Sequence, residues 1–253
     1  MDRLERERDF HNTAFTHDVR AAAEKYYTVT GRSRAHYLQR LSAMASHSRV
    51  LEYGCATGSA AFQLAGLGAQ VLGIDIADQA IELARARARE EGLAERCTFR
   101  VMNAEALALP DRSFDLVCGT GILHHLDLEK AFSEIARVLT PEGSAVFIEP
   151  LGHNPLLRLY RWLTPSLRTA DEHPLLAPDL VAAEAHFQLV QPSYYHLQAL
   201  AAVPFRRLPG FAALVRALDA SDALVFRHWP ALQRHAWNVV LELSRPLSAH
   251  RPS

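Results

Sequence analysis

Residues 51–60 read LEYGCATGSA, and this short stretch decides the fold. An apolar run ends at Gly54, and Gly58 follows four positions later, just before a helix-like segment. A strand that turns through glycines into a helix N-terminus forms a cradle for polar or anionic groups, because backbone N–H groups point outward there. Gly54 and Gly58 permit the tight backbone geometry that such a cradle needs.

The residues around this cradle alternate between strand-like and helix-like patterns. This alternation predicts βαβ units, and therefore a Rossmann-like α/β fold with an open parallel sheet covered by helices on both faces. The helix expected at 77–93 takes Asp78 as its N-cap, and Pro141 ends the helix expected at 128–140. The expected strands are 49–53, 69–75, 97–104, 113–121, 143–150, 189–197 and 235–246.

Composition narrows the function classes. The 253 residues are 49% apolar and 22% charged, with a net charge of −1, which is typical of one globular domain. There is no basic footprint for nucleic acid or for an anionic membrane, and no apolar run of membrane-spanning length. The first residues, MDRLERERDF, contain no apolar signal core, so we expect a cytoplasmic protein. The three cysteines have neither metal-ligand nor disulfide-framework spacing. The density of histidines and carboxylates at His153 and 171–173 suggests a metal, but the spacing fits no standard motif, so we expect a polar loop and no metal.

The predicted ligand follows from the phosphate-binding motifs that are absent from the glycine loop and from the polar residues at the ends of the next two strands. A phosphate-binding P-loop requires Gly-Lys-Ser/Thr, whereas Gly58 precedes Ser-Ala. A dinucleotide site requires G-x-G-x-x-G, whereas this loop is G-x-x-x-G. Asp75 ends the second strand, where a carboxylate accepts from ribose hydroxyls, and Asn103 ends the third, where an amide pairs with an adenine edge. The predicted ligand contains adenine, ribose and a small polar group, without pyrophosphate.

Four segments in order resemble one family: VLEYGCATG, VLGIDIADQAIELARARA, VMNAEALALPDRSFDLVCGTGILHHL and EIARVLTPEGSAVFIEP. Together they resemble the class I S-adenosylmethionine-dependent methyltransferases, in particular the small-molecule branch that includes the ubiquinone-biosynthesis type. The resemblance covers about residues 49–150. It implies S-adenosyl-L-methionine as cofactor, S-adenosyl-L-homocysteine as product, and a mostly parallel sheet with an antiparallel last strand.

The resemblance assigns roles to individual residues. Ala56 stands in place of the usual middle glycine of the loop, and Asn103 in place of the usual Asp; an amide still accepts from an adenine amine. Asp75 would bind the ribose and Ile76 would pack on the adenine. The methionine end would contact Glu52, Gly54, Cys55, Ala56, Thr57, Gly58 and Gly119, with Tyr27 at its carboxylate, and Asn103, Ala104 and Glu105 would lie around the adenine rim.

The resemblance also divides the single domain into three parts: an N-terminal helical lid at 1–46, a cofactor-binding core at 47–150, and acceptor-pocket elements with the last strands at 151–253. The lid aromatics and the apolar insertions would line an apolar acceptor pocket. The same residues fit core packing or a homodimer interface equally well. The residues expected to contact the acceptor are His11, Phe15, His153, Tyr160, His173 and Phe205.

Three residues are candidates for proton transfer to or from the acceptor. His124 and His125 follow the fourth strand, and an imidazole has a pKa suited to a general base. Adjacent residues point in different directions, so at most one histidine is expected to face the cleft, and His125 matches the common family position. Glu149 ends the fifth strand, either as a catalytic carboxylate or as an acceptor of backbone N–H groups.

The sequence therefore predicts a methyltransferase that acts on a small, hydrophobic or aromatic molecule, by O- or C-methylation in secondary metabolism. No nucleic-acid or membrane partner is expected. The alternative is a protein of the same fold that binds S-adenosylmethionine and either catalyses a non-methylating rearrangement or only senses the cofactor, because cofactor motifs survive such changes. Accumulation of S-adenosylhomocysteine separates the two hypotheses.

Overall fold

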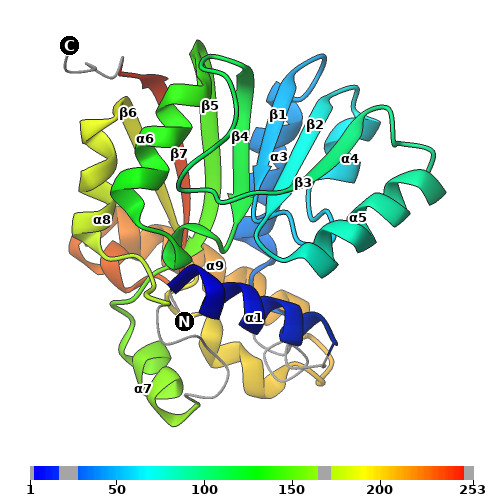
Figure 1. The fold of residues 1–253 in the computed structure, drawn as a ribbon. Helices are drawn as coiled ribbons and strands as arrows, with labels where there is room; N and C mark the ends of the chain where they lie inside the picture. The colour runs from blue at the N-terminus through cyan, green and yellow to red at the C-terminus, as the bar shows by residue number, and fades with distance from the viewer. Residues whose placement is uncertain (1–2, 17–27, 165–171, 248–253) are drawn as a thin grey trace.

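A seven-stranded sheet runs through the centre of the molecule in the order β3-β2-β1-β4-β5-β7-β6 (Figure 1). The structure is a computed structural model that describes residues 3–16, 28–164 and 172–247. The strands are β1 (Arg49–Tyr53), β2 (Gln70–Asp75), β3 (Cys97–Val101), β4 (Phe114–Thr120), β5 (Leu139–Pro150), β6 (Phe187–Tyr195) and β7 (Asn238–Pro246).

The sheet is mixed. β1 to β5 run parallel to one another, whereas β7 is antiparallel to β5 on one side and to β6 on the other. Glu242 of β7 sits opposite Val146 in one ladder and Gln191 in the other. The predicted Rossmann-like sheet, mostly parallel with an antiparallel last strand, is confirmed.

Each central strand buries both faces, as a parallel sheet with helices on each side requires. In β1, Leu51 packs into the hydrophobic cluster of one face and its neighbour Val50 into that of the other. Phe147 and Val146 alternate in the same way in β5. The first face is covered by α6 (Leu128–Val138) and α8 (Ala177–Ala182), and the second by α3 (Gly31–Met44), α4 (Ala61–Gly66) and α5 (Asp78–Glu90).

Two local predictions are wrong. Ala77, not Asp78, is the N-cap of α5, and Asp78 is the first residue of that helix. Pro141 lies inside β5, because α6 ends at Val138 and the strand begins one residue later. The register between β4 and β5 shifts just before Leu116, and this irregular stretch accommodates a residue that cannot donate a ladder hydrogen bond.

Further elements gather at the edge of the sheet where the parallel strands end (Figure 1). Among them, α1 runs beneath the strand ends. Arg3 of α1 forms an ion pair with Glu105, and Asn12 Nδ2 donates to Asp78 Oδ1 over 2.7 Å. Within the described ranges, no helix has the length and apolar character needed to cross a bilayer. The elements at this edge are α1 (Arg3–Thr16), η1 (Leu123–His125), α7 (Pro155–Leu163), η4 (Ala199–Phe205), α9 (Phe211–His228) and η5 (Pro230–His235), whereas η3 (Ala183–Ala185) leads into the start of β6.

Candidate functional site

A pocket of about 230 Å³ lies between α1 and the loops that follow β1, β2, β3 and β4. The carboxyl ends of neighbouring parallel strands meet at one edge, which is the usual place for a ligand in an open α/β sheet. Helix α1 contributes Arg3, Leu4 and Glu7 to the wall. Seven residues of the predicted site line this pocket: Gly54, Ala56, Asp75, Ile76, Asn103, Ala104 and His125.

The glycine loop has the tight geometry that its sequence predicts. Gly54 has a φ of +57° and Gly58 a φ of +88°. Ala56, in place of the usual glycine, also adopts a left-handed conformation with a φ of +48°. For a residue with a Cβ this conformation costs roughly 1–2 kcal/mol. The Ala56 N–H donates to Asp75 Oδ2 over 2.9 Å, which helps to hold the loop in this shape.

Asp75 ties the first two loops together. Its Oδ2 accepts from Ala56 N and its Oδ1 from Ala77 N, each over 2.9 Å. A carboxylate oxygen has two lone pairs, so each oxygen retains capacity for a second donor from the pocket. The carboxylate is thus oriented before any ligand binds.

Glu52 supports the loop from below. It is completely buried and accepts from Ser59 Oγ over 2.6 Å, from Ala60 N over 2.7 Å and from Ala61 N over 3.0 Å. It therefore satisfies N–H groups at the start of α4. Burial raises the pKa of the Glu52 carboxyl, against the effect of these three hydrogen bonds. Ser59, which the sequence analysis missed, is the residue of this group that lines the pocket.

Besides Glu52, five predicted cofactor contacts lie outside the lining formed by the described residues: Cys55, Thr57, Gly58, Glu105 and Gly119. Cys55 is completely buried, and burial raises the pKa of its thiol well above the usual value. A Cβ added to Gly119 would lie 2.8 Å from side-chain atoms of Ile122 and Phe147. Gly119 therefore allows close packing beneath the turn, and direct contact of these residues with a cofactor stays a prediction.

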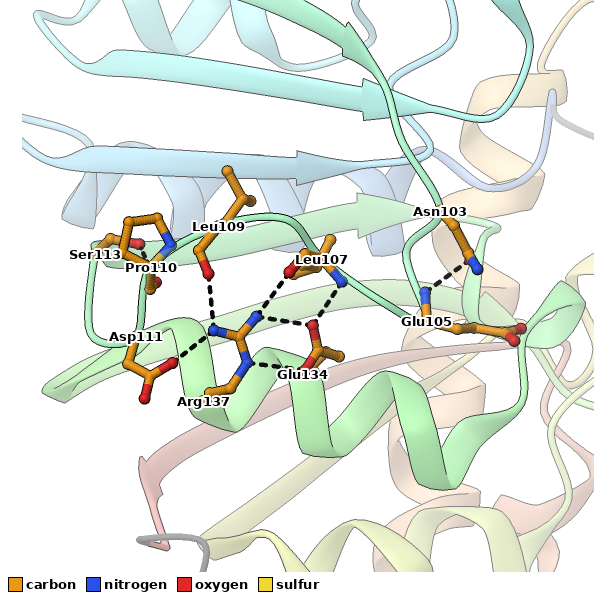
Figure 2. A network of polar contacts seen from close by, with 9 residues as sticks. All are labelled: Asn103, Glu105, Leu107, Leu109, Pro110, Asp111, Ser113, Glu134 and Arg137. Carbon is orange, nitrogen blue, oxygen red and sulfur yellow. Dashed lines mark hydrogen bonds and ion pairs between the residues drawn. The ribbon is translucent and has the colours of Figure 1, made fainter. Parts of the chain in front are cut away.

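The loop after β3 is shaped by Asn103 and Glu105. Asn103 Oδ1 accepts from the Glu105 N–H over 2.9 Å (Figure 2), and Asn103 also lines the pocket. The Glu105 carboxylate, which is outside the lining, accepts from Asp127 N over 2.8 Å and pairs with Arg3 of α1. Glu105 thus anchors the helix that covers the pocket.

Arg137 of α6 fixes the rest of this loop, as Figure 2 shows. Its guanidinium donates to the carbonyls of Leu107 and Leu109 over 3.1 and 2.8 Å. It also forms ion pairs with Glu134 and Asp111 at 2.8 and 2.6 Å. These carboxylates raise the pKa of Arg137 further. The contacts with Leu107, Leu109 and Asp111 join the loop to α6, and no local motif in the sequence identified them.

The two adjacent histidines occupy different environments. His124 is buried, and its Nδ1 lies 2.7 Å from Glu149 Oε2. Glu149 Oε1 accepts from the backbone N–H groups of Ile122 and Leu123. His125 lines the pocket, and its Nδ1 lies 3.2 Å from Glu7 Oε2. One histidine faces the pocket and the other packs inside, as their adjacency predicts.

The expected acceptor contacts are scattered. His153 Nε2 accepts from Ala177 N over 3.3 Å, and His173 donates its backbone N–H to the His124 carbonyl over 3.0 Å. Phe205 is 48% exposed. His11 and Phe15 lie in α1 and Tyr160 lies in α7, but their side chains are outside the described set, as is Tyr27 altogether. Their contacts with an acceptor or cofactor stay predictions.

The sequence analysis placed the ligand-facing residues of the N-terminal segment at its aromatics and missed Arg3, Leu4 and Glu7. These three positions lie on one face of α1 at i, i+1 and i+4, and Glu7 is 4% exposed. A charged residue at helical spacing from an apolar one is a weak signal, because most such faces are solvated.

Comparison with known proteins matches this site to one family. Residues 51–147 match a family model described as "Methyltransferase domain". The chain is 38% identical over 107 residues to methyltransferase GfsG of Streptomyces halstedii, covering 42% of this chain and 38% of that protein. It is 37% identical over 131 residues to aklanonic acid methyltransferase DauC of Streptomyces sp. (strain C5), covering 50% and 57%. The chain thus spans less than two thirds of either relative.

The fold is also found among solved structures. Phosphoethanolamine N-methyltransferase 2 of Haemonchus contortus, in complex with S-adenosyl-L-methionine, superimposes with a TM-score of 0.64. The match covers 94% of this chain and 59% of that chain at 21% sequence identity, and at this identity it shows a shared fold.

Proposed function

We propose that this chain, whose residues 51–147 match the methyltransferase-domain model, is a class I S-adenosylmethionine-dependent methyltransferase that transfers a methyl group to a small molecule. The observation that carries the proposal is the convergence of Gly54, Asp75 and Asn103 on one pocket from the ends of three strands. A loop cradle, a ribose acceptor and an adenine-edge amide are the groups that this cofactor requires.

The residues in the pocket fit the cofactor. Asp75 retains acceptor capacity for the ribose hydroxyls, and the apolar side chains of Ile76 and Met102 would border the adenine. The Asn103 amide would meet the edge of the base. Among the described lining residues, the carboxylates of Asp75 and Glu7 outnumber the one arginine, Arg3, and this charge favours a ligand that carries a positive sulfonium.

When bound, S-adenosylmethionine supplies a methyl group that is already activated by the sulfonium. The protein must then hold the acceptor in line and exclude bulk water. Helix α1 covers the pocket through Arg3, Leu4 and Glu7, and would exclude solvent there. His125 faces the same pocket, where it would position the acceptor or take part in removing its proton.

For the acceptor we propose a hydrophobic or aromatic small molecule, methylated on oxygen or carbon in secondary metabolism. A cluster formed by Val29, Ala199, Ala202, Val203 and Trp237 supports this choice. Phe211 of α9 and Leu157 of α7 pack against it and remain partly accessible. These elements lie at the same edge of the sheet as the pocket and would give an acceptor site an apolar wall (Figure 1).

The test is turnover with a panel of phenolic and enolic small molecules and S-adenosylmethionine. We expect S-adenosylhomocysteine and a methylated product to form in equal amounts with at least one acceptor. Saturable cofactor binding without S-adenosylhomocysteine formation across the panel would instead favour a non-methylating protein of the same fold.

A further inference from the structure

We propose that His124, His125 and Glu172 bind one divalent transition-metal ion beside the pocket. Each of the three side chains offers one ligand atom, and these atoms all lie within 4.8 Å of one another. Two imidazoles and one carboxylate form a ligand set that suits Zn²⁺, Co²⁺, Mn²⁺ or Fe²⁺ and leaves positions open for water or an oxygen ligand.

The backbone brings these ligands together from two distant segments. His124 and His125 belong to η1, directly after β4, whereas Glu172 precedes α8. The His173 N–H donates to the His124 carbonyl over 3.0 Å, and Leu175 forms a parallel bridge with Leu151. The segment that carries Glu172 is therefore held against η1 and the end of β5.

The surroundings of His124 resemble the outer shell of a metal-bound histidine. Its Nδ1 lies 2.7 Å from Glu149 Oε2, so Nε2 is the nitrogen that remains for a metal. Glu149 is itself fixed by the N–H groups of Ile122 and Leu123 at 2.8 and 2.9 Å. A carboxylate on the far nitrogen orients a ligating imidazole and raises its basicity.

The other two ligands are supported in the same way. His125 Nδ1 lies 3.2 Å from Glu7 Oε2, and Glu172 Oε1 accepts from Arg161 over 2.6 Å. Metal-ligating carboxylates are commonly hydrogen-bonded by such second groups. All three ligands are therefore oriented by a charged neighbour.

The charges around the two imidazoles favour a cation at this place. The ring centroids of His124 and His125 are 4.2 Å apart. The carboxylates of Glu7, Glu149 and Glu172 lie next to the pair, and the first two are almost completely buried. One divalent cation bound by the two imidazoles and Glu172 would compensate part of this negative charge.

The position of the ion gives it a role that rests on the proposed function. His125 also lines the pocket, so a metal ion on this residue would stand at the border of the cofactor site. There it would bind an oxygen of the acceptor and lower the pKa of that hydroxyl. In this state His125 would serve as a ligand, and the proton of the metal-bound hydroxyl would pass to a water molecule held at an open position of the ion.

Metal binding is tested on the untagged full chain after removal of metals with a chelator. Titration with Co²⁺ is followed by its visible absorption, and titration with Zn²⁺ by calorimetry. We expect one equivalent to bind, and Glu172→Gln to weaken binding by about 10–100-fold. Since Glu172 is partly exposed, this isosteric variant tests the site without a demand on the core. The matched control is His228→Gln, an exposed histidine on α9, which should bind Co²⁺ as the parent does.

Two results would overturn the metal site: no saturable Co²⁺ or Zn²⁺ binding by the parent, or unchanged affinity in Glu172→Gln. Binding of S-adenosylmethionine to the metal-free chain is measured separately. A chain that binds Co²⁺ but not S-adenosylmethionine keeps the metal site and loses the proposed function. A chain that binds S-adenosylmethionine but no Co²⁺ keeps the proposed function and loses the metal site.

Discussion

His124 Nδ1 and Glu149 Oε2 lie 2.7 Å apart in a buried pair that joins the turn after β4 to the end of β5. The same carboxylate accepts from two backbone N–H groups of that turn. Because the turn is fixed in this way, His125 is held toward the pocket. The pair thus connects the ends of β4 and β5 and helps to orient His125, which lines the pocket.

The first prediction concerns His125. His125→Ala should lower turnover by roughly 10²–10⁴-fold, the usual contribution of a group that assists proton transfer or orients the reacting atom. Affinity for S-adenosylmethionine should change little, because the proposed contacts with the cofactor lie at Asp75 and the glycine loop. The measurements are steady-state kinetics and calorimetry, with His228→Ala as control. A parallel collapse of cofactor binding would show that His125 supports the pocket itself.

Asp75 is expected to dominate binding of the ribose. Asp75→Asn keeps the size of the side chain but removes its charge, and each charge-assisted hydrogen bond contributes about 1.5–3 kcal/mol. Calorimetry should show a loss of this size in the binding free energy of S-adenosylmethionine. Asp115→Asn, at the start of β4, is the matched control. Equal affinities in the two variants would contradict the ribose assignment.

The third prediction concerns the backbone conformation of the glycine loop at Gly54. Gly54→Ala would force a Cβ into a left-handed conformation at a φ of +57°, 2.8 Å from Ile122 Cδ1. We expect the free energy of unfolding to fall by about 1–2 kcal/mol and cofactor affinity to fall with it, since Ile122 also lines the pocket. Gly66→Ala, where no atom lies within 4 Å of the added carbon, should cost nothing. A Gly54→Ala chain as stable as its parent would show that the loop adapts freely.

The fourth prediction concerns the contacts of Arg3 that hold α1 over the pocket. Arg3→Ala removes the ion pair with Glu105 and a 2.7 Å hydrogen bond to the His125 carbonyl. Hydrogen exchange over residues 3–16 should become faster, and S-adenosylmethionine should bind more weakly. The exposed Arg216 of α9 supplies the control variant, Arg216→Ala. If exchange and affinity match in the two variants, α1 is held by its other contacts.

Asp115 gives a test of pH dependence away from the pocket. Hydrogen bonds from Arg49 hold the pKa of the Asp115 carboxyl below its ordinary value. Because the folded-state pKa is depressed, this pair stabilises the fold above the unfolded pKa of about 3.9 and loses its effect as the pH falls through the lower folded value. At neutral pH, Asp115→Asn should lower the free energy of unfolding by about 0.2–1 kcal/mol, as expected for a partly exposed pair. Denaturation curves at several pH values should show the difference vanish in acid; a constant difference would contradict the assignment.

Sequence reasoning placed Asp75, Asn103 and His125 because strand ends can be identified from local pattern. In a parallel sheet those ends meet at one edge, so position along the chain translates directly into position in space.

The remaining parts depend on tertiary docking. Glu7 faces His125 only because α1 lies beneath the strand ends, and Glu172 reaches η1 only because its segment pairs with the end of β5. The hydrogen bonds from Arg137 to the carbonyls of Leu107 and Leu109 join α6 to a loop nearly thirty residues earlier in the chain. The hydrophobic periodicity of a single segment does not predict contacts between distant segments. The sequence analysis expected no metal because the spacing of candidate ligands along the chain matched no standard motif.

The most direct test of the central claim is a calorimetric titration of the purified chain with S-adenosylmethionine, with S-adenosylhomocysteine and NAD run in parallel. We predict saturable binding of both sulfur nucleotides at one site and no binding of NAD. Absence of binding for both sulfur nucleotides, or tighter binding of NAD, would contradict the assignment of LEYGCATGSA as the cradle for this cofactor.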